Sequence, residues 1–321
     1  MRQANWDRVP IEIQSIDAPL SRAAIFLTLT VEAGDGPLAP VRDLLSGLDD
    51  LVKSVSFPHL DAKLSCVVAI GSDLWDRLSP RRRPKALAPF QPVIGNPHRA
   101  PATPGDLLFH IRAERQDLCF ALETLILDRL RGAVAVADEV FGFRYYDARD
   151  LLGFIDGTAN PTGDKLPAST LVGNEDRHFA GGSHVTVQKY LHDLGVWNAK
   201  STEAQQAVIG RTKADNIELA DAPADAQKSH KTLTTITDPD GTEHDILRDN
   251  MPFGRPGAGE FGTYFIGYSR DPAVTQKMLE RMFIGDPPGL YDKILDASRA
   301  VTGARFFAPT AEMLAGVGSE K

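Results

Sequence analysis

The sequence predicts an α+β protein made of two domains in tandem, each an antiparallel sheet with helices on one face. Strand and helix signals in the first half follow the order β-α-β-β-α-β, which is typical of a split βαβ (ferredoxin-like) domain. The second half repeats part of this order, and 321 residues are enough for two domains of ordinary size. We place the domains at residues 1–150 and 151–321.

The first half contains four strand signals and two helical patterns. The strand signals are short runs rich in apolar and β-branched residues, at 24–31, 64–70, 107–113 and 134–143. Apolar side chains recur at helical spacing between Pro40 and Val55, and a second helical pattern extends from about Asp117 to Arg131. This order predicts an antiparallel sheet with both helices on the same face.

The second half shows the same kinds of signal less regularly. The expected elements are a strand at 184–191, a helix opened by a capping box at Thr202–Gln205 and ended by Gly210, a strand at 263–268, a helix capped by Asp271 that extends to Gly285, and a last helix from about Leu290 to Thr302. Residues 109–123 and 265–280 share a strand-Arg-helix pattern, which indicates a weak internal repeat. Residues 211–229 lack periodicity and predict a long surface loop.

The balance of charge argues against nucleic acid as a partner. The formal net charge is -8 and the sequence pI is about 5.5, whereas binding to phosphates needs a basic face. The dense basic run Arg81–Lys85 lies among prolines and predicts a solvated loop, with a local anionic contact as the alternative. No apolar run reaches the length that spans a membrane.

Cysteine usage and the first residues favour a cytoplasmic protein. Cys66 and Cys119 are too few for a disulfide framework, and both are expected to be reduced core residues. The ligand spacing of zinc fingers is absent from the sequence. Met1–Trp6 shows neither an apolar signal core nor a twin arginine.

The segment Gly153–Pro161 is the most informative candidate for a functional site. It places Asp156 after an apolar pair and before a Gly-Thr turn, so the carboxylate lies at the end of a buried segment. Gly157 supplies backbone freedom, and Asn160 followed by proline prevents a regular element from continuing. A carboxylate in such a position either caps the turn through its own backbone or takes part in chemistry.

Two further residues stand out in the second half. His230 lies where the loop of residues 211–229 returns to the β-rich segment 232–236, and it is either a solvated loop histidine or a functional one. Arg248 lies within a short apolar run, where a buried guanidinium needs an anion as its partner. That anion is either a neighbouring carboxylate such as Asp249 or a ligand.

Asp292 and Asp296 form a pair of acids one turn apart in the expected last helix. Most such pairs are simply solvated. Alternatively, one of the two accepts a hydrogen bond from a histidine that binds a metal, which is the usual partner of such an imidazole.

Taken in this order along the chain, the motifs resemble those of the dye-decolourising peroxidases, and the B-type branch most of all. They are the runs Gly153–Thr158, Arg248–Phe253 and Gly262–Tyr268 together with His230, and supporting matches lie at 103–113, 187–193 and 282–285. The resemblance extends from about residue 20 to residue 310. A Gly-x-x-Asp-Gly element with a correctly placed His and Arg is specific to that family.

The resemblance implies a haem peroxidase with one haem b per chain, bound in the C-terminal half of a tandem ferredoxin-like fold. His230 would be the proximal ligand of the haem iron, and Asp292, or alternatively Asp296, would orient it. The polar residues implied on the distal side are Asp156, Arg248 and Asn250. Arg211 would contact a haem propionate.

The implied reaction is the reduction of hydrogen peroxide and the oxidation of dyes, phenols or other one-electron donors through a ferryl intermediate. Aromatic side chains that could relay electrons to the surface, or are simply core residues, are Trp75, Tyr190, Trp197 and Tyr264. We also expect a homo-oligomer that binds neither nucleic acid nor membranes. Two alternatives stay open: a protein that handles haem or porphyrin, by iron release or porphyrinogen oxidation, and a binding module that has lost haem.

Overall fold

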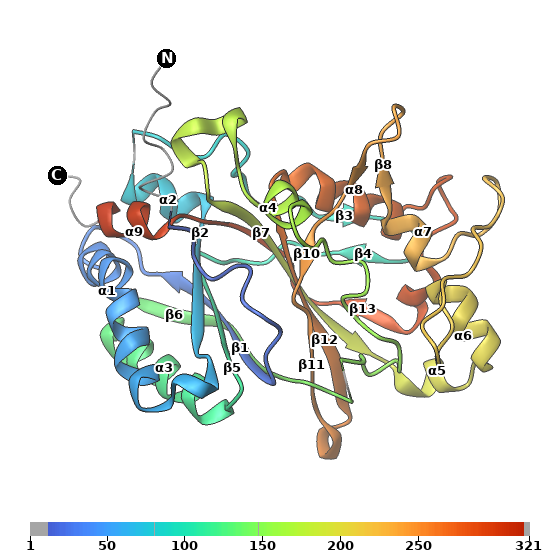
Figure 1. The fold of residues 1–321 in the computed structure, drawn as a ribbon, viewed down its shortest axis with the longest axis horizontal. Helices are drawn as coiled ribbons and strands as arrows, with labels where there is room; N and C mark the ends of the chain where they lie inside the picture. The colour runs from blue at the N-terminus through green and yellow to red at the C-terminus, as the bar shows by residue number, and fades with distance from the viewer. Residues whose placement is uncertain (1–11, 80, 147, 318–321) are drawn as a thin grey trace.

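A single large sheet runs through the whole molecule, with most of the helices towards its two ends (Figure 1). The structure is a computed structural model that describes residues 12–79, 81–146 and 148–317. The expectation of a cytoplasmic protein rests partly on Met1–Trp6. These residues lie outside the described ranges. Within them, no helix combines the length and the apolar character that crossing a membrane requires.

The first half is a four-stranded antiparallel sheet with two helices packed on one face. Its strands are β1 (Ala23–Val31), β2 (Ser65–Gly71), β5 (Leu107–Ala113) and β6 (Val134–Phe143), which pair in the order β2-β5-β1-β6. Helices α1 (Leu38–Ser56) and α3 (Gln116–Arg129) cover this sheet. The apolar side chains that predicted α1, including Val41, Leu44 and Leu48, are buried beneath it. The split βαβ order expected from the sequence is confirmed.

The second half repeats this arrangement. Strands β7 (Ser183–His192), β10 (Leu247–Arg248), β12 (Glu260–Ser269) and β14 (Ala304–Ala308) pair in the order β10-β12-β7-β14. The first, second, third and fourth main strands of each half therefore occupy equivalent places. The strand-Arg-helix repeat in the sequence corresponds to β5 followed by α3 and to β12 followed by α8 (Pro272–Phe283).

The two sheets are joined edge to edge. β14 pairs antiparallel with β2, with Phe306 opposite Gly71 and Phe307 opposite Ile70. Over the described residues this creates one ten-stranded sheet, in which β11 (Met251–Arg255) lies beside β12 and β13 (Ser298–Ala300) beside β7. The boundary that we place near residue 150 falls in the connection between β6 and β7, and as a domain boundary it stays a prediction.

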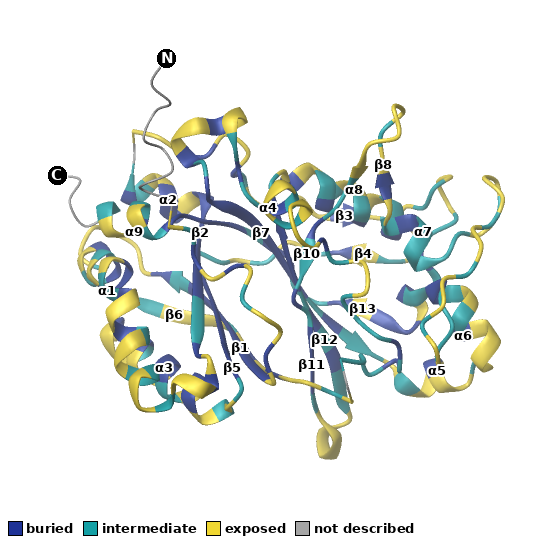
Figure 2. Cartoon of the chain, viewed as in Figure 1, coloured by how far each residue is buried: buried dark blue, intermediate teal, exposed yellow. Residues whose placement is uncertain are grey.

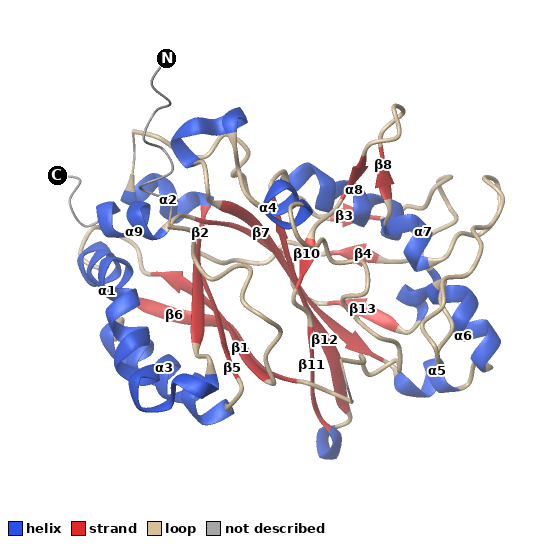
Figure 3. Cartoon of the chain, in the orientation of Figure 1, coloured by secondary structure: helices blue, strands red, loops and turns tan. Residues whose placement is uncertain are grey.

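The remaining elements of the described chain are short. Helices are α2 (Ser72–Leu78), α4 (Lys165–Thr170), α5 (Leu194–Asn198), α6 (Thr202–Ile209), α7 (His230–Thr234) and α9 (Ala311–Val317), and 3-10 turns lie at Phe57–Ala62, Asn174–Phe179, Pro256–Ala258 and Lys293–Asp296. Short strands are β3 (Val93–Ile94), β4 (Arg99–Ala100), β8 (Ile236–Thr237) and β9 (Glu243–His244). Figure 3 shows α1 and α3 at one end of the sheet and α5, α6 and α7 at the other.

Burial follows this plan, since the central strands are buried and the helices expose their outer faces (Figure 2). One apolar core lies between the first half of the sheet and its helices. The sheet also curls, so that β11 contacts β6 and the inner faces of both halves share a second core. Phe26 of β1 stacks on Tyr264 of β12 within this shared core, with ring centroids 4.2 Å apart.

The prediction of a last helix from about Leu290 to Thr302 is wrong. The chain forms a 3-10 turn at Lys293–Asp296 and then β13, where Ser298 pairs with His192 of β7. The apolar spacing in this segment suits either a helix or a strand, and the unpaired edge of β7 decides between them. Asp292 caps the turn, so it does not share a helix face with Asp296.

Two local features also differ from the sequence patterns. The cap of α6 is Ser201 and not Thr202, because the Ser201 hydroxyl accepts a hydrogen bond from the backbone N–H of Ala204. The segment 232–236 is β-rich in composition, but most of it belongs to the short helix α7, which begins at His230. Four of the five residues in this segment are β-branched, but the Ser229 hydroxyl, which accepts a hydrogen bond from the N–H of Thr232, favours a helical turn instead.

Candidate active site

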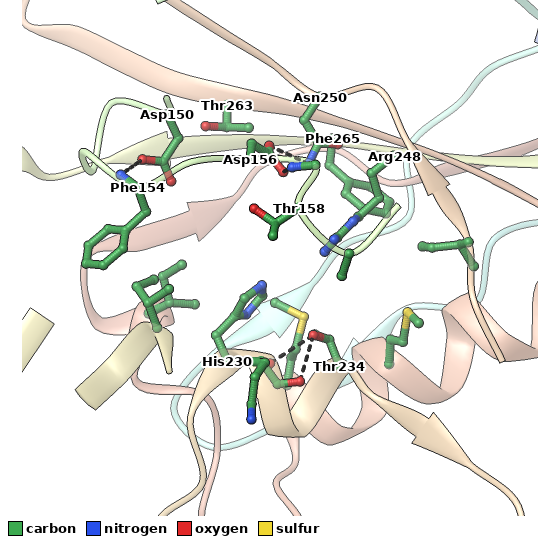
Figure 4. A pocket seen from close by; sticks show the side chains of 18 of the residues that line it. Asp150, Phe154, Asp156, Thr158, His230, Thr234, Arg248, Asn250, Thr263 and Phe265 are labelled. Atoms are coloured by element: carbon green, nitrogen blue, oxygen red, sulfur yellow. Dashed lines mark hydrogen bonds between the residues drawn. The ribbon is translucent and has the colours of Figure 1, made fainter. Parts of the chain in front are cut away.

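A cavity of about 230 Å³ lies in the second half, between the sheet and the helices α7 and α8. Much of its wall is apolar and consists of Leu152, Phe154, Ile209, Phe265, Leu279 and Met282. Polar side chains enter it from two opposite sides. Figure 4 shows His230 on one side and Asp156, Arg248 and Asn250 on the other.

His230 is positioned by the start of α7. The long loop 211–229 ends at the Ser229 cap, and His230 is the first residue of the helix, with its ring extending into the cavity (Figure 4). Its Nδ1 lies 2.7 Å from Oδ2 of Asp292. Because Nδ1 is held by this carboxylate, Nε2 is the nitrogen that remains for a ligand.

Asp292 is completely buried, and its other oxygen is also occupied. Oδ1 accepts a hydrogen bond of 3.1 Å from the backbone N–H of Ile294 as the cap of the 3-10 turn. Asp296 lies elsewhere, with Oδ1 bonded to Nε2 of His98 at 3.1 Å and to the hydroxyl of Tyr291 at 2.9 Å. The structure therefore brings Asp292, and not Asp296, to His230.

The carboxylate of Asp156 is held by two donors on the opposite side. Oδ1 accepts from the backbone N–H of Gly157 at 2.7 Å, and Oδ2 accepts from Nδ2 of Asn250 at 2.9 Å. Gly157 has a φ of +78°, a conformation that glycine adopts without steric cost. Asn250 is itself held, because its Oδ1 accepts from the N–H of Ile266 at 3.1 Å. Asp156 thus makes the turn contact and still faces the cavity.

Arg248 lies in β10, and Asn160 of the Asp156 motif holds its backbone on both sides. Nδ2 of Asn160 donates to the Arg248 carbonyl at 2.7 Å, and Oδ1 accepts from the Arg248 N–H at 3.0 Å. The alternative of an ion pair with Asp249 is wrong, because the Asp249 carboxylate accepts from Arg112 at 2.7 Å. Among the described residues the Arg248 guanidinium forms no ion pair, so it is a cation available to the cavity.

Arg211 also lines the cavity, close to the long loop. Its guanidinium donates to Glu218 at 3.0 Å and to the carbonyl of Asn216 at 3.3 Å. Part of its charge is therefore balanced by Glu218, whose carboxylate is half exposed. The structure thus leaves Arg211 at the cavity but not as a free cation.

Sequence reasoning missed several residues that line the same cavity, and Asp150 is the most notable. Burial raises the pKa of its carboxyl to about 7, and the nearby Asp156 acts in the same direction. His192, a second missed residue, bonds Ser298 and Thr263, and burial lowers its pKa to about 4. The nearness of Asp150 to Asp156 in sequence was a usable signal, whereas His192 looked like an ordinary strand residue.

The arrangement matches a known family of enzymes over nearly all of the chain. The family pattern described as "Dyp-type peroxidase, N-terminal" matches residues 14–144, and "Dyp-type peroxidase, C-terminal" matches residues 147–313. The chain belongs to the Dyp-type peroxidase family. The resemblance noted in the sequence is therefore confirmed.

Individual relatives agree with this assignment. A dye-decolorizing peroxidase from Mycolicibacterium paratuberculosis is 56% identical over 95% of this chain and 85% of its own length. The structure of DyPB from Rhodococcus jostii RHA1 has a TM-score of 0.91 and 55% identity, covering 94% of this chain and 97% of its own. A DypB variant from that organism, solved in complex with haem, also has a TM-score of 0.91 at 55% identity, covering 94% and 96%. This likeness confirms the ferredoxin-like fold and identifies the chain as a dye-decolourising peroxidase.

Proposed function

We propose that this peroxidase binds haem b in the cavity through Nε2 of His230 and reduces hydrogen peroxide at the opposite wall. The observation that carries the proposal is the arrangement in Figure 4, where an imidazole faces a carboxylate, a guanidinium and an amide across an apolar space. The oxidation of dyes, phenols or other one-electron donors completes the reaction. We expect one haem per chain, because His230 faces one such wall in the part of the chain that the structure describes.

The residues present suit a haem group. Apolar side chains such as Phe154, Phe265 and Met282 form a surface on which a porphyrin ring can pack and from which it displaces water. His230 supplies the single protein ligand, and its orientation is set by Asp292. Arg211, at the edge of the cavity, is our candidate partner for a haem propionate, which would compete with Glu218 for the guanidinium.

Asp292 supports the proposed ligand electronically as well as geometrically. A carboxylate that accepts a hydrogen bond from Nδ1–H makes the imidazole a stronger electron donor, which would favour O–O bond cleavage at a haem iron that His230 holds. Since Asp292 is fully buried, the interaction is weakly screened by water.

The opposite wall supplies proton transfer and charge stabilisation. When bound, haem iron supplies the redox chemistry by which the O–O bond of peroxide is reduced. Asp156 takes a proton from one peroxide oxygen and returns it to the other, while Asn250 keeps the carboxylate in place. Arg248 stabilises the negative charge that develops as the bond breaks.

The decisive experiment combines haem binding with two product assays. Purified protein titrated with haem should develop a Soret band, His230→Ala should weaken binding or change the spectrum, and the loaded enzyme should decolourise a dye with peroxide. A protein that releases iron-free porphyrin from haem and turns over no dye would favour the haem-handling alternative. The comparisons do not favour that alternative, since the relatives named here at 50% identity or more bear the peroxidase name.

We further propose that the enzyme is a cytoplasmic homo-oligomer. The two cysteines are free, as expected in a reducing compartment. Strand β6 lies at the edge of the sheet and exposes Val136, Phe141 and Phe143, which a second copy would cover. Light scattering after size exclusion tests the assembly, and a monomer at micromolar concentration would contradict it.

A further inference from the structure

A chain of buried polar side chains lies beneath the peroxide-facing wall, in the core that the two halves share. Its members are His110 and Arg112 of β5, Tyr268 of β12, and Asp249 between the two wall residues Arg248 and Asn250. Each is at most 2% exposed. Burying four such groups is costly unless each has a partner, so the contacts between them are informative.

The contacts form a continuous series. The Tyr268 hydroxyl lies 2.9 Å from Nδ1 of His110, and Nε2 of His110 lies 3.8 Å from Oδ2 of Asp249. The same Asp249 oxygen accepts a 2.7 Å hydrogen bond from Arg112. A proton on Nε2 faces a carboxylate, which leaves Nδ1 as the acceptor of the phenolic O–H.

Tyr268 differs in its partner from the other buried tyrosines of the described chain. The hydroxyl of Tyr190 donates to the amide oxygen of Gln188 at 2.8 Å, and that of Tyr264 is hydrogen-bonded to Thr28. Neither an amide nor an alcohol takes up a proton near neutral pH. An imidazole is a base, so Tyr268 alone among the buried tyrosines of the described chain is hydrogen-bonded to a group that can accept its proton.

We propose that Tyr268 and His110 form a redox-active pair that stores one oxidising equivalent of the peroxidase reaction. The proposal rests on the proposed function, because hydrogen peroxide is the oxidant. Once peroxide has been reduced, the active site lacks two electrons, and Tyr268 supplies one of them. The hydroxyl proton of Tyr268 passes to Nδ1 of His110, which leaves a neutral tyrosyl radical beside an imidazolium. A one-electron donor later reduces the radical, and the proton returns from Nδ1.

The surroundings suit both states of the pair. At rest the tyrosine is neutral, since burial raises its pKa, and the histidine is neutral, since burial and then Arg112 lower its pKa. After proton transfer the imidazolium faces the Asp249 carboxylate, which offsets the repulsion from Arg112. Phe26 stacks on the His110 ring at a centroid distance of 4.8 Å and excludes water from it.

The pair is also connected to the active site. Leu247 is paired with Tyr268 across β10 and β12, and Arg248 is the next residue along the strand. Asp249 links Arg248 to Asn250 in the backbone while its carboxylate faces His110. An electron leaving Tyr268 therefore has a short route through β10 to the cavity wall.

Freeze-quench electron paramagnetic resonance of the haem-loaded enzyme after mixing with hydrogen peroxide tests the proposal. Wild type should give a tyrosyl signal that narrows when ring-deuterated tyrosine is incorporated. Tyr268→Phe should lose that signal, whereas the matched control Tyr264→Phe, in the same strand and equally buried, should keep it. A tyrosyl signal of full amplitude in Tyr268→Phe, or none in wild type, would overturn the proposal.

Two further measurements address the proton and the folding of the variants. His110→Gln retains a hydrogen bond to the hydroxyl but no base, so it should lose the signal too; an undiminished signal would overturn the role of His110. In wild type, electron-nuclear double resonance in deuterated buffer should detect an exchangeable deuteron hydrogen-bonded to the phenoxyl oxygen, and its absence would overturn the proposed pair even if no variant folds. If peroxide leaves the Soret band unchanged, the proposed function fails as well; if the band responds without a tyrosyl radical, only this inference fails.

Discussion

At the scale of single residues, each polar group that faces the cavity is held by a partner behind it. Asp292 holds His230, Asn250 holds Asp156, and Asn160 holds the backbone of Arg248. These partners fix rotamers and tautomers before a ligand binds, which reduces the reorganisation that the reaction needs.

Replacing Arg248 with leucine should slow the reaction with peroxide more than replacing Asp156 with alanine. Loss of a group that stabilises developing negative charge costs about 10²–10³ in rate. Water can carry a proton in place of Asp156, whereas the other permanent cations that line the cavity, Arg211 and Lys231, are already bound to Glu218. Stopped-flow mixing with peroxide, followed at the Soret band, compares the two variants. Equal rates of reaction with peroxide for Arg248→Leu and wild type would contradict the role of Arg248 in stabilising the developing negative charge.

Asp292→Asn should weaken haem binding or activity by about 10–100-fold, the usual cost of losing the partner of a metal-binding histidine. The matched control is Asp296→Asn, because Asp296 contacts His98 and Tyr291 and not His230. Haem titration and the rate of dye turnover measure both variants. An equal loss in the two would show that the effect is not specific to His230.

At the scale of elements, long periodic segments were predictable and short ones were not. Helices α1 and α3 and the long strands bury their own repeating apolar faces, so their sequence pattern is sufficient. Helix α7 and strand β13 are shorter, and their form depends on a cap or on a neighbouring strand. His230 lies in one of these short elements, which is why its orientation could not be predicted.

The cap of α6 offers a direct test of local structure. Ser201→Ala should destabilise the protein by about 0.5–2 kcal/mol, because the Ala204 N–H loses its acceptor. Thr202→Ala, one residue later, should change stability by much less, since Thr202 is not the cap. Urea denaturation of both variants measures the difference. A larger loss of stability for Thr202→Ala than for Ser201→Ala would show instead that Thr202 is the cap.

Helix α3 contains a buried acid that should make stability depend on pH. Burial, and then the nearby Glu139, raises the pKa of Glu123 from 4.5 to about 8. Between these values the folded state keeps a proton that the unfolded state has lost, so stability should fall as pH rises from 5 to 8. Glu123→Gln removes this contribution and should lose less stability over that range. Thermal melting of wild type and Glu123→Gln at both pH values measures this difference. An equal loss of stability in the two proteins would refute the prediction.

At the scale of the whole molecule, the continuous sheet should make the two halves unfold together. Strand β14 belongs to the second half by sequence but pairs with β2 of the first. Trp75 and Trp197 are buried in different halves, so variants whose single tryptophan is Trp75 or Trp197 report on each half separately. We expect coincident urea midpoints in the haem-free protein. Two separate midpoints would show instead that the halves are independent.

The sequence by itself determined the split βαβ order, its repetition, and the family motifs, because these depend on residue type and spacing along the chain. Through the resemblance to the dye-decolourising peroxidases, the sequence also predicted that Asp156, His230 and Arg248 belong to one site. Only the tertiary structure decided which acid meets His230 and which cation meets Asp249, since those contacts join segments far apart in sequence. The joined sheet and the Tyr268–His110 contact are likewise products of packing between the halves.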